Sequence, residues 1–207
     1  ILIEIVKAVR AVVSSTFTVA VKLNSADFQR GGFSAEDAQQ VVKMLNDLSV
    51  DLVELSGGSY EAPAMQGQAR DGRTLAREAY FLEFAQEIGK VAHMPIMVTG
   101  GIRRKPIAEQ VIDSGIDMVG IATALAIDPN LPNAWKQGQN IAPELKPIHW
   151  ENKTLASLAN MATVKFQLQK LSHGKTPNPK VSPLWALIVQ QTETTCRTRQ
   201  YKKRMRE

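Results

Sequence analysis

The sequence predicts an α/β protein in which parallel strands alternate with helices. Short apolar segments rich in β-branched residues recur along residues 1–121, and segments with helical periodicity separate them. This alternation favours parallel strands joined by right-handed crossover helices. Both an open doubly wound sheet and a (β/α)8 barrel satisfy it. Polar loops, several with paired glycines, follow the strand ends. These loops favour the barrel, because a barrel collects them on one face.

Periodicity and capping residues define the elements in order. Apolar residues at helical spacing predict a helix over 1–13, and a β-branched run predicts a strand over 18–23. Ser34 is a favourable N-cap, with acidic residues in the following turn, for a helix that reaches about Leu48. The later units are predicted as strands at 51–55, 95–99 and 117–121 and as helices at 73–91 and 106–114.

The character of the chain changes after Asn130. The next twenty residues carry three prolines and no clear period, which predicts an extended connection. An amphipathic helix is then expected, with its apolar stripe at Leu155, Leu158, Ala162 and Phe166. Ser182 and Pro183 are typical of the start of a last helix, which runs into a basic end. No strand is expected beyond Ile121.

Composition limits the classes of partner. The formal net charge is +5, but residues 197–207 hold six basic residues and one acidic residue, so the rest of the chain is balanced. This gives no reason to expect a nucleic-acid partner. The longest apolar runs fall far short of the roughly 20 residues that span a membrane, so no membrane partner is expected. A single cysteine, Cys196, favours a reducing, cytoplasmic location. The chain opens within a helical pattern and without Met, which indicates a processed or incomplete chain.

Lys22 is the first candidate for chemistry. Strand alternation places Lys22 on the face opposite Val19 and Val21, which is the inward face of a barrel. There its positive charge can stabilise an anionic ring or an enolate. The alternative is an ion pair with Glu54, which falls on the equivalent face of the next strand. The pattern leaves both interpretations open.

Glycines at two consecutive strand ends are the second candidate. Gly100 and Gly101 follow one strand, and the segment 120–123 ends the next. Glycine lets an anion approach the backbone closely, and a phosphate site between the last two strands recurs in (β/α)8 barrels. Arg103 and Arg104 supply positive charge nearby in sequence. The alternative is a tight turn flanked by solvated arginines; we favour phosphate.

Other chemistry is disfavoured. The three histidines share no metal-ligand spacing, so no metal site is expected. The serine at position 56 does not lie in the Gly-x-Ser-x-Gly turn of hydrolases, and no Gly-x-Gly-x-x-Gly segment is present. No catalytic residue is assigned from the sequence.

Four of the strand-end segments resemble those of a known family. VAVKLNSADFQRGGFS (19–34), DLVELSGGSYEAPAM (51–65), PIMVTGGIR (95–103) and DMVGIATALAIDPNLP (117–132) are similar, in order and spacing, to the second half of the NADH:flavin oxidoreductases of the old yellow enzyme family. The resemblance implies a TIM barrel of which only about the last four β/α units are present, in residues 1–135. Residues 136–207 would then form a connection and a helical C-terminal extension with a basic tail.

The resemblance also implies a cofactor and a reaction. The family binds FMN, takes hydride from NAD(P)H and passes it to an activated alkene or enone, its small-molecule substrate. Lys22 stands where the family has a basic residue at the pyrimidine edge of the flavin. Gly100 and Gly101 match the phosphate-binding loop after strand seven, and Ala122 and Thr123 match the loop after strand eight. Many members have Gly-Arg at that second loop, so Arg103 or Arg104 would have to supply the charge here.

The family's first four strands, with the substrate-binding histidines, are expected before Ile1. Four strands cannot close an eight-stranded barrel, so their inner face is expected to be wet. Two other functions therefore stay open. One is a non-catalytic half-barrel that binds a partner, including a second copy through its open sheet edges. The other is a different phosphate-binding barrel enzyme.

Overall fold

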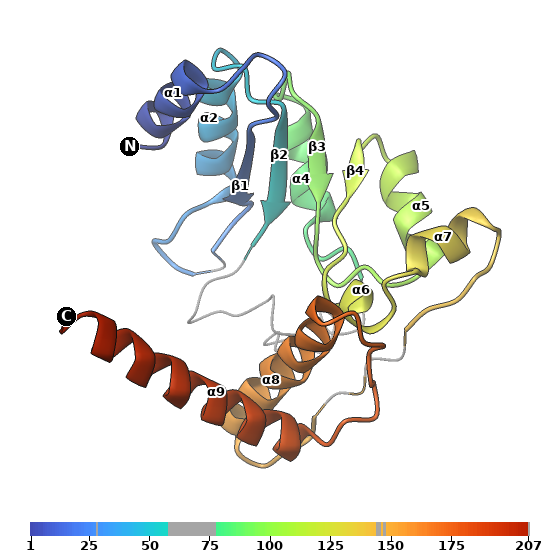
Figure 1. Cartoon of the computed structure of the whole chain (residues 1–207). Helices are drawn as coiled ribbons and strands as arrows, with labels where there is room; N and C mark the ends of the chain where they lie inside the picture. The colour runs from blue at the N-terminus through green and yellow to red at the C-terminus, as the bar shows by residue number, and fades with distance from the viewer. Residues whose placement is uncertain (28, 58–77, 144–145, 147, 207) are drawn as a thin grey trace. The chain divides into compact units, whose positions relative to one another are not determined.

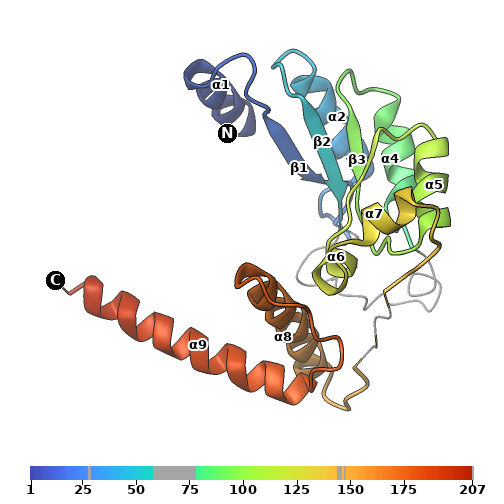
Figure 2. The same ribbon diagram turned by 45° about the vertical axis from the view of Figure 1, so that its right-hand side comes forward.

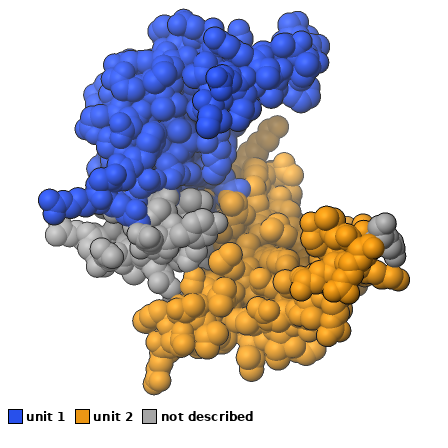
Figure 3. Space-filling model, turned by 90° about the vertical axis from the view of Figure 1, so that its left-hand side faces the viewer, with its two compact units in different colours: residues 1–121 blue, residues 122–207 orange. Residues whose placement is uncertain are grey.

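The computed structural model describes residues 1–27, 29–57, 78–143, 146 and 148–206. The chain forms two compact units, residues 1–121 and residues 122–207 (Figure 3). The sequence-based boundary after residue 135 stays a prediction about domain organisation. Most of the loop at 56–72, and residues 73–77 of the helix expected at 73–91, lie outside the described residues.

The first unit alternates helices and strands as predicted. Its elements are α1 (Leu2–Val12), β1 (Ala20–Asn24), α2 (Ala35–Leu45), β2 (Leu52–Ser56), α4 (Leu82–Gly89), β3 (Ile96–Val98), α5 (Lys105–Asp113) and β4 (Met118–Val119). The four strands lie within the four segments that strand periodicity predicted or end one residue beyond them. The α/β class is thus confirmed.

The sheet is parallel, and its strands follow one another in the order β1-β2-β3-β4 (Figure 1). Each strand pairs with the next strand along the chain. A doubly wound sheet reverses its strand order at a switch point, whereas a barrel adds each strand beside the previous one. The consecutive order therefore favours the barrel. In the described part of the chain, β1 and β4 are the edges of an open sheet.

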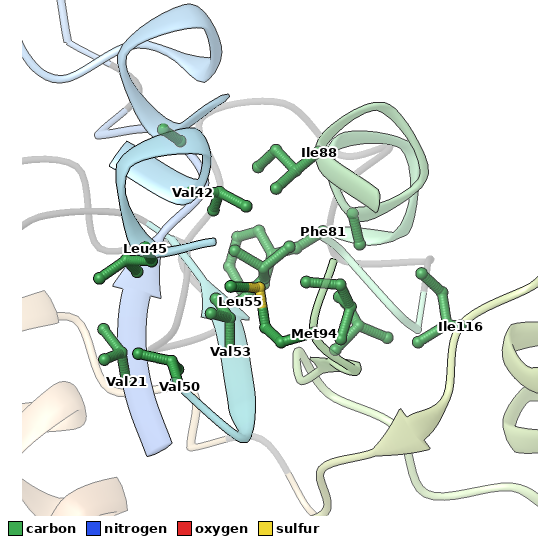
Figure 4. Packing of buried hydrophobic residues seen from close by; sticks show 14 of the residues in the cluster. Val21, Val42, Leu45, Val50, Val53, Leu55, Phe81, Ile88, Met94 and Ile116 are labelled. Carbon is green, nitrogen blue, oxygen red and sulfur yellow. The ribbon is translucent and has the colours of Figure 1, made fainter. Parts of the chain in front are cut away.

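The core lies between the sheet and its helices. Helices α2, α4 and α5 lie on one side of the sheet (Figure 2). Val53 and Leu55 of β2 point toward Val42 of α2 and toward Phe81 and Ile88, and all five side chains are almost fully excluded from solvent (Figure 4). Burying a side chain of this size contributes about 1.5–3 kcal/mol. Alternate residues on the strands thus hold the helices in place.

The opposite face of the sheet is open. Lys22 and Met118 on this face are exposed, and Glu54 and Met97 are half-buried. This is the face that a closed barrel would enclose. Its side chains are exposed to solvent or half-buried, as expected for four strands. The buried and open faces separate because successive strand residues point to opposite sides.

Helix α2 begins where the sequence predicted. Ser34 Oγ accepts a hydrogen bond from Asp37 N at 3.2 Å, and Asp37 Oδ2 accepts one from Ser34 N at 2.9 Å. This reciprocal capping box satisfies two backbone donors that the first helical turn leaves unpaired. The hydrogen bond from the Ser34 backbone N–H, with a smaller contribution from the Ser34 side chain, lowers the pKa of the Asp37 carboxyl below its usual value.

In the described part of the helix expected over 73–91, α4 begins at Leu82. Residues 78–81 form a turn instead, so the prediction is wrong there. Ala79 has a φ of +58°, in the left-handed region that interrupts a right-handed helix. The backbone N–H of Tyr80 donates to Gly100 O at 3.2 Å, outside any helical ladder. A long-range contact therefore takes the place of helical bonds at residues 78–81.

The second unit is helical in its described residues. It contains α6 (Thr123–Ile127), α7 (Leu131–Lys136), α8 (Lys153–Ser172) and α9 (Pro183–Arg204). Helix α7 corrects the prediction of an extended segment from Asn130. Its Pro132 lies in the first turn, where a missing N–H costs no hydrogen bond. Of the helices in the described ranges, none combines the length and the hydropathy that a membrane span requires.

Helix α8 packs against α9 and α6, and small residues are among its buried positions. Ala156, Ala159 and Ala162 are buried, whereas Leu155 and Leu158 are 45% and 40% exposed. The helix was predicted correctly. Of its predicted stripe, Ala162 is buried and Phe166 half-buried, but Leu155 and Leu158 are exposed, so the prediction is wrong for the two leucines.

Candidate functional site

The carboxyl end of β3 is a turn that only glycine can form. Gly100 has a φ of +121° and Gly101 a φ of +74°. A Cβ on Gly101 would lie 2.5 Å from Tyr80 Oη, and one on Gly100 would lie 3.0 Å from Phe81 Cδ2. The turn therefore needs glycine for its backbone conformation and also for its close contact with the aromatic pair.

The same turn carries backbone donors. Among the described residues, the backbone N–H groups of Gly100 and Gly101 have no hydrogen-bond acceptor. Gly100 O is used, since it accepts from Tyr80 N. Parallel strands present such loops at their carboxyl edge, where ligands bind in α/β folds. The two backbone donors fit an oxyanion, such as the phosphate of a nucleotide, on a side of the turn that the Tyr80 and Phe81 rings do not cover.

The ends of β3 and β4 lie side by side. Gly120 N donates to Val98 O at 2.8 Å, and a Cβ on Gly120 would overlap the Thr99 side chain. Ala122 and Thr123 follow two residues later, and they belong to the second unit. The structure thus places the predicted glycine pair in one unit and Ala122 and Thr123 in the other.

Arg103 and Arg104 both bind the carboxylate of Glu78. Glu78 Oε1 accepts from Arg103 Nε at 3.1 Å and from Arg104 Nε at 2.7 Å. Glu78 Oε2 accepts from the backbone N–H groups of the same two arginines, each at 3.2 Å. The Glu78 side chain is only 6% exposed, so this carboxylate is buried among four donors. The arginines are thus paired with an internal acid, although their side chains stay 39% and 52% exposed.

Glu78 is a residue that the sequence did not identify. It lies 25 residues before Arg103 in a segment that was predicted to be helical. No spacing rule connects an acid and a base across such an interval. The sequence holds one weak signal for a buried acid. Glu78 lies next to the aromatic pair Tyr80–Phe81, whereas the exposed face of a helix is usually polar.

Tyr80 lies close both to the Arg103–Glu78 pair and to the Gly100–Gly101 turn. Its ring packs edge-on against Phe81, with centroids 6.2 Å apart and an interplanar angle of 87°. Burial raises the pKa of the Tyr80 hydroxyl above its usual value; the charge of Arg103 opposes this rise and that of Glu78 adds to it. The hydroxyl is thus held as a neutral donor beside Gly101.

Lys22 and Glu54 form an ion pair on the open face of the sheet. They are register partners across β1 and β2, and Lys22 Nζ contacts Glu54 Oε1. The ion-pair interpretation therefore holds, but it does not remove Lys22 from solvent, because its side chain is still 50% exposed. A half-exposed ammonium keeps donors for another group.

Polar residues gather at the carboxyl ends of β1 and β2, and the sequence analysis did not single them out. Asn24 Nδ2 donates to Asp27 Oδ1 at 2.8 Å, and Ser25 N donates to Ser56 O at 2.6 Å. Among the described residues, no set of three His, Cys, Asp or Glu side chains is placed to hold a metal ion.

The consecutive parallel sheet and its glycine-ended strands define part of a (β/α)8 barrel domain. Comparison with known proteins gives the family. The sequence model of the NADH:flavin oxidoreductase / NADH oxidase family matches residues 1–141, and the chain belongs to this family. The resemblance inferred from the strand-end segments is confirmed, and so are the family's cofactors, a flavin (FMN) with NADH as electron donor.

Individual relatives agree with the family. The chain is 39% identical over 141 residues to the NADH-dependent flavin oxidoreductase iliE of Neonectria sp., covering 64% of this chain and 18% of the relative. It is 36% identical over 143 residues to the NADH-dependent flavin oxidoreductase iccE of Talaromyces variabilis, covering 64% and 33%. The chain thus spans a third or less of the length of these relatives.

A solved structure confirms the fold. The old yellow enzyme homologue from Zymomonas mobilis superposes with a TM-score of 0.50 at 20% identity, over 71% of this chain and 38% of that chain. At this identity the likeness concerns the fold alone. It agrees with a partial TIM barrel followed by C-terminal helices.

Proposed function

We propose that this chain supplies the FMN phosphate-binding part of an ene-reductase or NAD(P)H oxidase of the old yellow enzyme type. Such an enzyme moves hydride from NAD(P)H through the flavin to an activated alkene or enone. The observation that carries the proposal is the Gly100–Gly101 turn at the end of β3, with its positive φ angles and two N–H groups without a described acceptor. Membership of a flavin oxidoreductase family supports it.

The phosphate end of the cofactor would bind mainly through the backbone. Gly100 and Gly101 offer N–H donors and carry no side chain of their own, while the Tyr80 and Phe81 rings pack against their Cβ positions. Ala122 and Thr123 belong to the second unit, so their part in phosphate binding is proposed from the family resemblance alone. Arg103 contributes through its Nη atoms, because its Nε already donates to Glu78.

The ring end of the cofactor would lie near Lys22. FMN, when bound, supplies hydride transfer by alternating between oxidised and reduced forms. Lys22 would stabilise the negative charge of the reduced form, because a fixed cation favours an anion that develops beside it. Glu54 reduces the net charge at this position and orients the ammonium group. No residue of the described chain is assigned a proton-transfer step.

One observation favours a second candidate, a partner-binding half-barrel. In the described residues both β1 and β4 are sheet edges, and edge strands offer unpaired backbone groups to another chain. A second copy is one occupant that this function would allow, giving a homo-oligomer. The family match favours the flavin function over the third interpretation, another phosphate-binding barrel enzyme.

Flavin binding to the purified chain tests the proposal. We expect a yellow sample, or quenching of FMN fluorescence on titration, and weaker binding by Gly101→Ala. In the full-length protein, Lys22→Ala is expected to slow flavin reduction by NAD(P)H, with Lys22→Arg close to the original rate. A colourless protein that does not bind FMN and has the mass of a dimer in solution would support the partner-binding half-barrel instead.

A further inference from the structure

Glu78 occupies a position that has the chemistry of an anion site. Two backbone N–H groups and two guanidinium Nε groups converge on its carboxylate, at 2.7–3.2 Å. Arg104 is the N-cap of α5, a nine-residue helix, so the backbone donors lie where the helix dipole favours negative charge. No side chain of α5 caps these donors, and the carboxylate comes from another segment of the chain.

We propose that Glu78 is an internal anion that fills this site, and that it is a positioning residue for the glycine turn. Its carboxylate fixes the backbone at Arg103 and Arg104, immediately after Gly100 and Gly101. The next residues of its own segment continue the attachment, because Tyr80 N donates to Gly100 O and the Tyr80 ring covers Gly101. One short segment thus holds both ends of the β3–α5 turn.

Charge and burial support this role over simple packing. Two arginines and one carboxylate leave a net charge of +1, and the carboxylate is the most deeply buried of the three side chains. Burying a carboxylate is costly unless charged donors surround it, so four donors on one carboxylate indicate a site shaped for an anion. The arginines are partly exposed, so a small anion from solvent can reach the site when Glu78 is shortened.

A consequence follows for the cofactor, and this part rests on the proposed function. The N–H groups of Arg103 and Arg104, just before the first turn of α5, would otherwise be available to a phosphate. Because Glu78 accepts from both groups, the flavin phosphate is directed to Gly100 and Gly101 instead. The class of ligand that can replace the Glu78 side chain is a small monoanionic carboxylate, such as formate, or inorganic phosphate.

Chemical rescue tests the internal anion. Glu78→Ala should melt several degrees below the original protein in sodium chloride. Sodium formate at equal ionic strength should restore most of this loss, and inorganic phosphate should restore part of it. Neither salt should raise the melting temperature of the original protein by more than it raises that of Glu87→Ala. Glu87 is the matched control, because it is an exposed acid on α4 paired only at the surface with Lys90.

Glu78→Gln separates the anion role from packing. Its side chain has the same size, so it keeps the packing, carries no charge and leaves no room for formate. We expect it to be less stable than the original protein and insensitive to formate. Glu78→Gln with unchanged stability, or Glu78→Ala that is destabilised but indifferent to both anions, would overturn the proposal. Should Glu78→Ala fail to fold in chloride and in formate, the stability of Glu78→Gln alone decides.

FMN titration of the same variants separates this inference from the proposed function. If the original protein binds FMN, Glu78→Ala should bind about tenfold more weakly in chloride and regain affinity in formate. If formate restores the stability of Glu78→Ala but the original protein does not bind FMN, the internal anion is supported and the proposed function is contradicted. FMN affinity unchanged in Glu78→Ala would overturn the positioning role.

Discussion

Lys22 and Glu54 are register partners on adjacent parallel strands, and their ion pair lies on the face of the sheet that carries no helices. The ion-pair interpretation of the sequence is confirmed, and the role of Lys22 beside an anionic ring stays a prediction. The pair neutralises part of the Lys22 charge, and it also holds the ammonium in a defined place at the carboxyl half of β1. The charge that a cofactor would meet here is therefore set by two residues.

The Lys22–Glu54 pair should contribute little to folding. Half-exposed ion pairs are screened by solvent, so a double-mutant cycle with Lys22→Met and Glu54→Gln should give a coupling of about 0.2–1 kcal/mol. Urea denaturation of the four proteins measures it. A coupling of more than about 2 kcal/mol would show a pair that solvent does not screen, and would make structure rather than cofactor binding its main role.

Gly101→Ala should destabilise the first unit through two separate effects. A left-handed φ costs a residue with a Cβ about 1–2 kcal/mol, and the new Cβ would also overlap the Tyr80 ring. Gly115→Ala is the matched control, because Gly115 has a φ of +91° but open space around its Cβ position. Thermal or urea unfolding should show a larger loss for Gly101→Ala. Equal losses would mean that the contact with Tyr80 is loose.

Tyr80 should make stability fall at alkaline pH. Its pKa is raised in the folded protein, so above pH 10 the unfolded chain loses this proton more readily than the folded chain. The stability contribution is therefore complete below the ordinary pKa of about 10 and is lost as pH rises through the higher folded value. Unfolding of the original protein and of Tyr80→Phe, compared between pH 8 and pH 11, measures it. The variant should show the shallower decline, and parallel profiles would contradict the prediction.

Arg10 should be a strong contributor to the stability of the first unit. It donates to Ser49 O at 2.8 Å and to Phe17 O at 2.7 Å, and it pairs with Asp51. Its side chain is only 17% exposed, so Arg10→Ala should cost about 1.5–3 kcal/mol. Lys7→Ala, at an exposed position of the same helix, should change stability by less than about 0.5 kcal/mol. Similar losses for the two variants would argue against the long-range bonds of Arg10.

Acid should weaken the same region through Asp51. Its bond from Val19 N and its contact with Arg10 lower the pKa of the carboxyl. A lowered folded pKa gives stability that is present above the ordinary value near 4 and is lost as pH falls through the folded value. The stability difference between the original protein and Asp51→Asn should therefore be larger at pH 7 than at pH 3. A difference that does not depend on pH would rule out this linkage.

Local patterns predicted the repeating part of the fold and missed its exceptions. Strand alternation placed Lys22 opposite Val21, and the capping box at Ser34 marked the start of α2. Residues 78–81 were wrongly predicted as helical, because Tyr80 N donates to Gly100 O, which is distant in sequence, and Ala79 has a positive φ. Helix α7 was missed because Pro132 and the later prolines of the segment outweighed a short helical pattern.

The candidate site was predictable only in its glycines and in its Lys22 side chain. Glycine pairs and alternation are local signals, so Gly100, Gly101 and Lys22 could be singled out from the sequence. The carboxylate that binds Arg103 and Arg104 could not, since the contact between Glu78 and these residues depends on how two loops meet in space. Whether the singled-out residues bind FMN stays a prediction.

Because every strand pairs with its successor, the hydrogen bonds between the four strands do not depend on what lies beside the edge strands β1 and β4. A further β/α repeat can join only beside β1 or beyond β4, and either addition would leave the existing strand registers unchanged. Such a fold can gain or shed repeats one at a time while the remaining ladder keeps its hydrogen bonds.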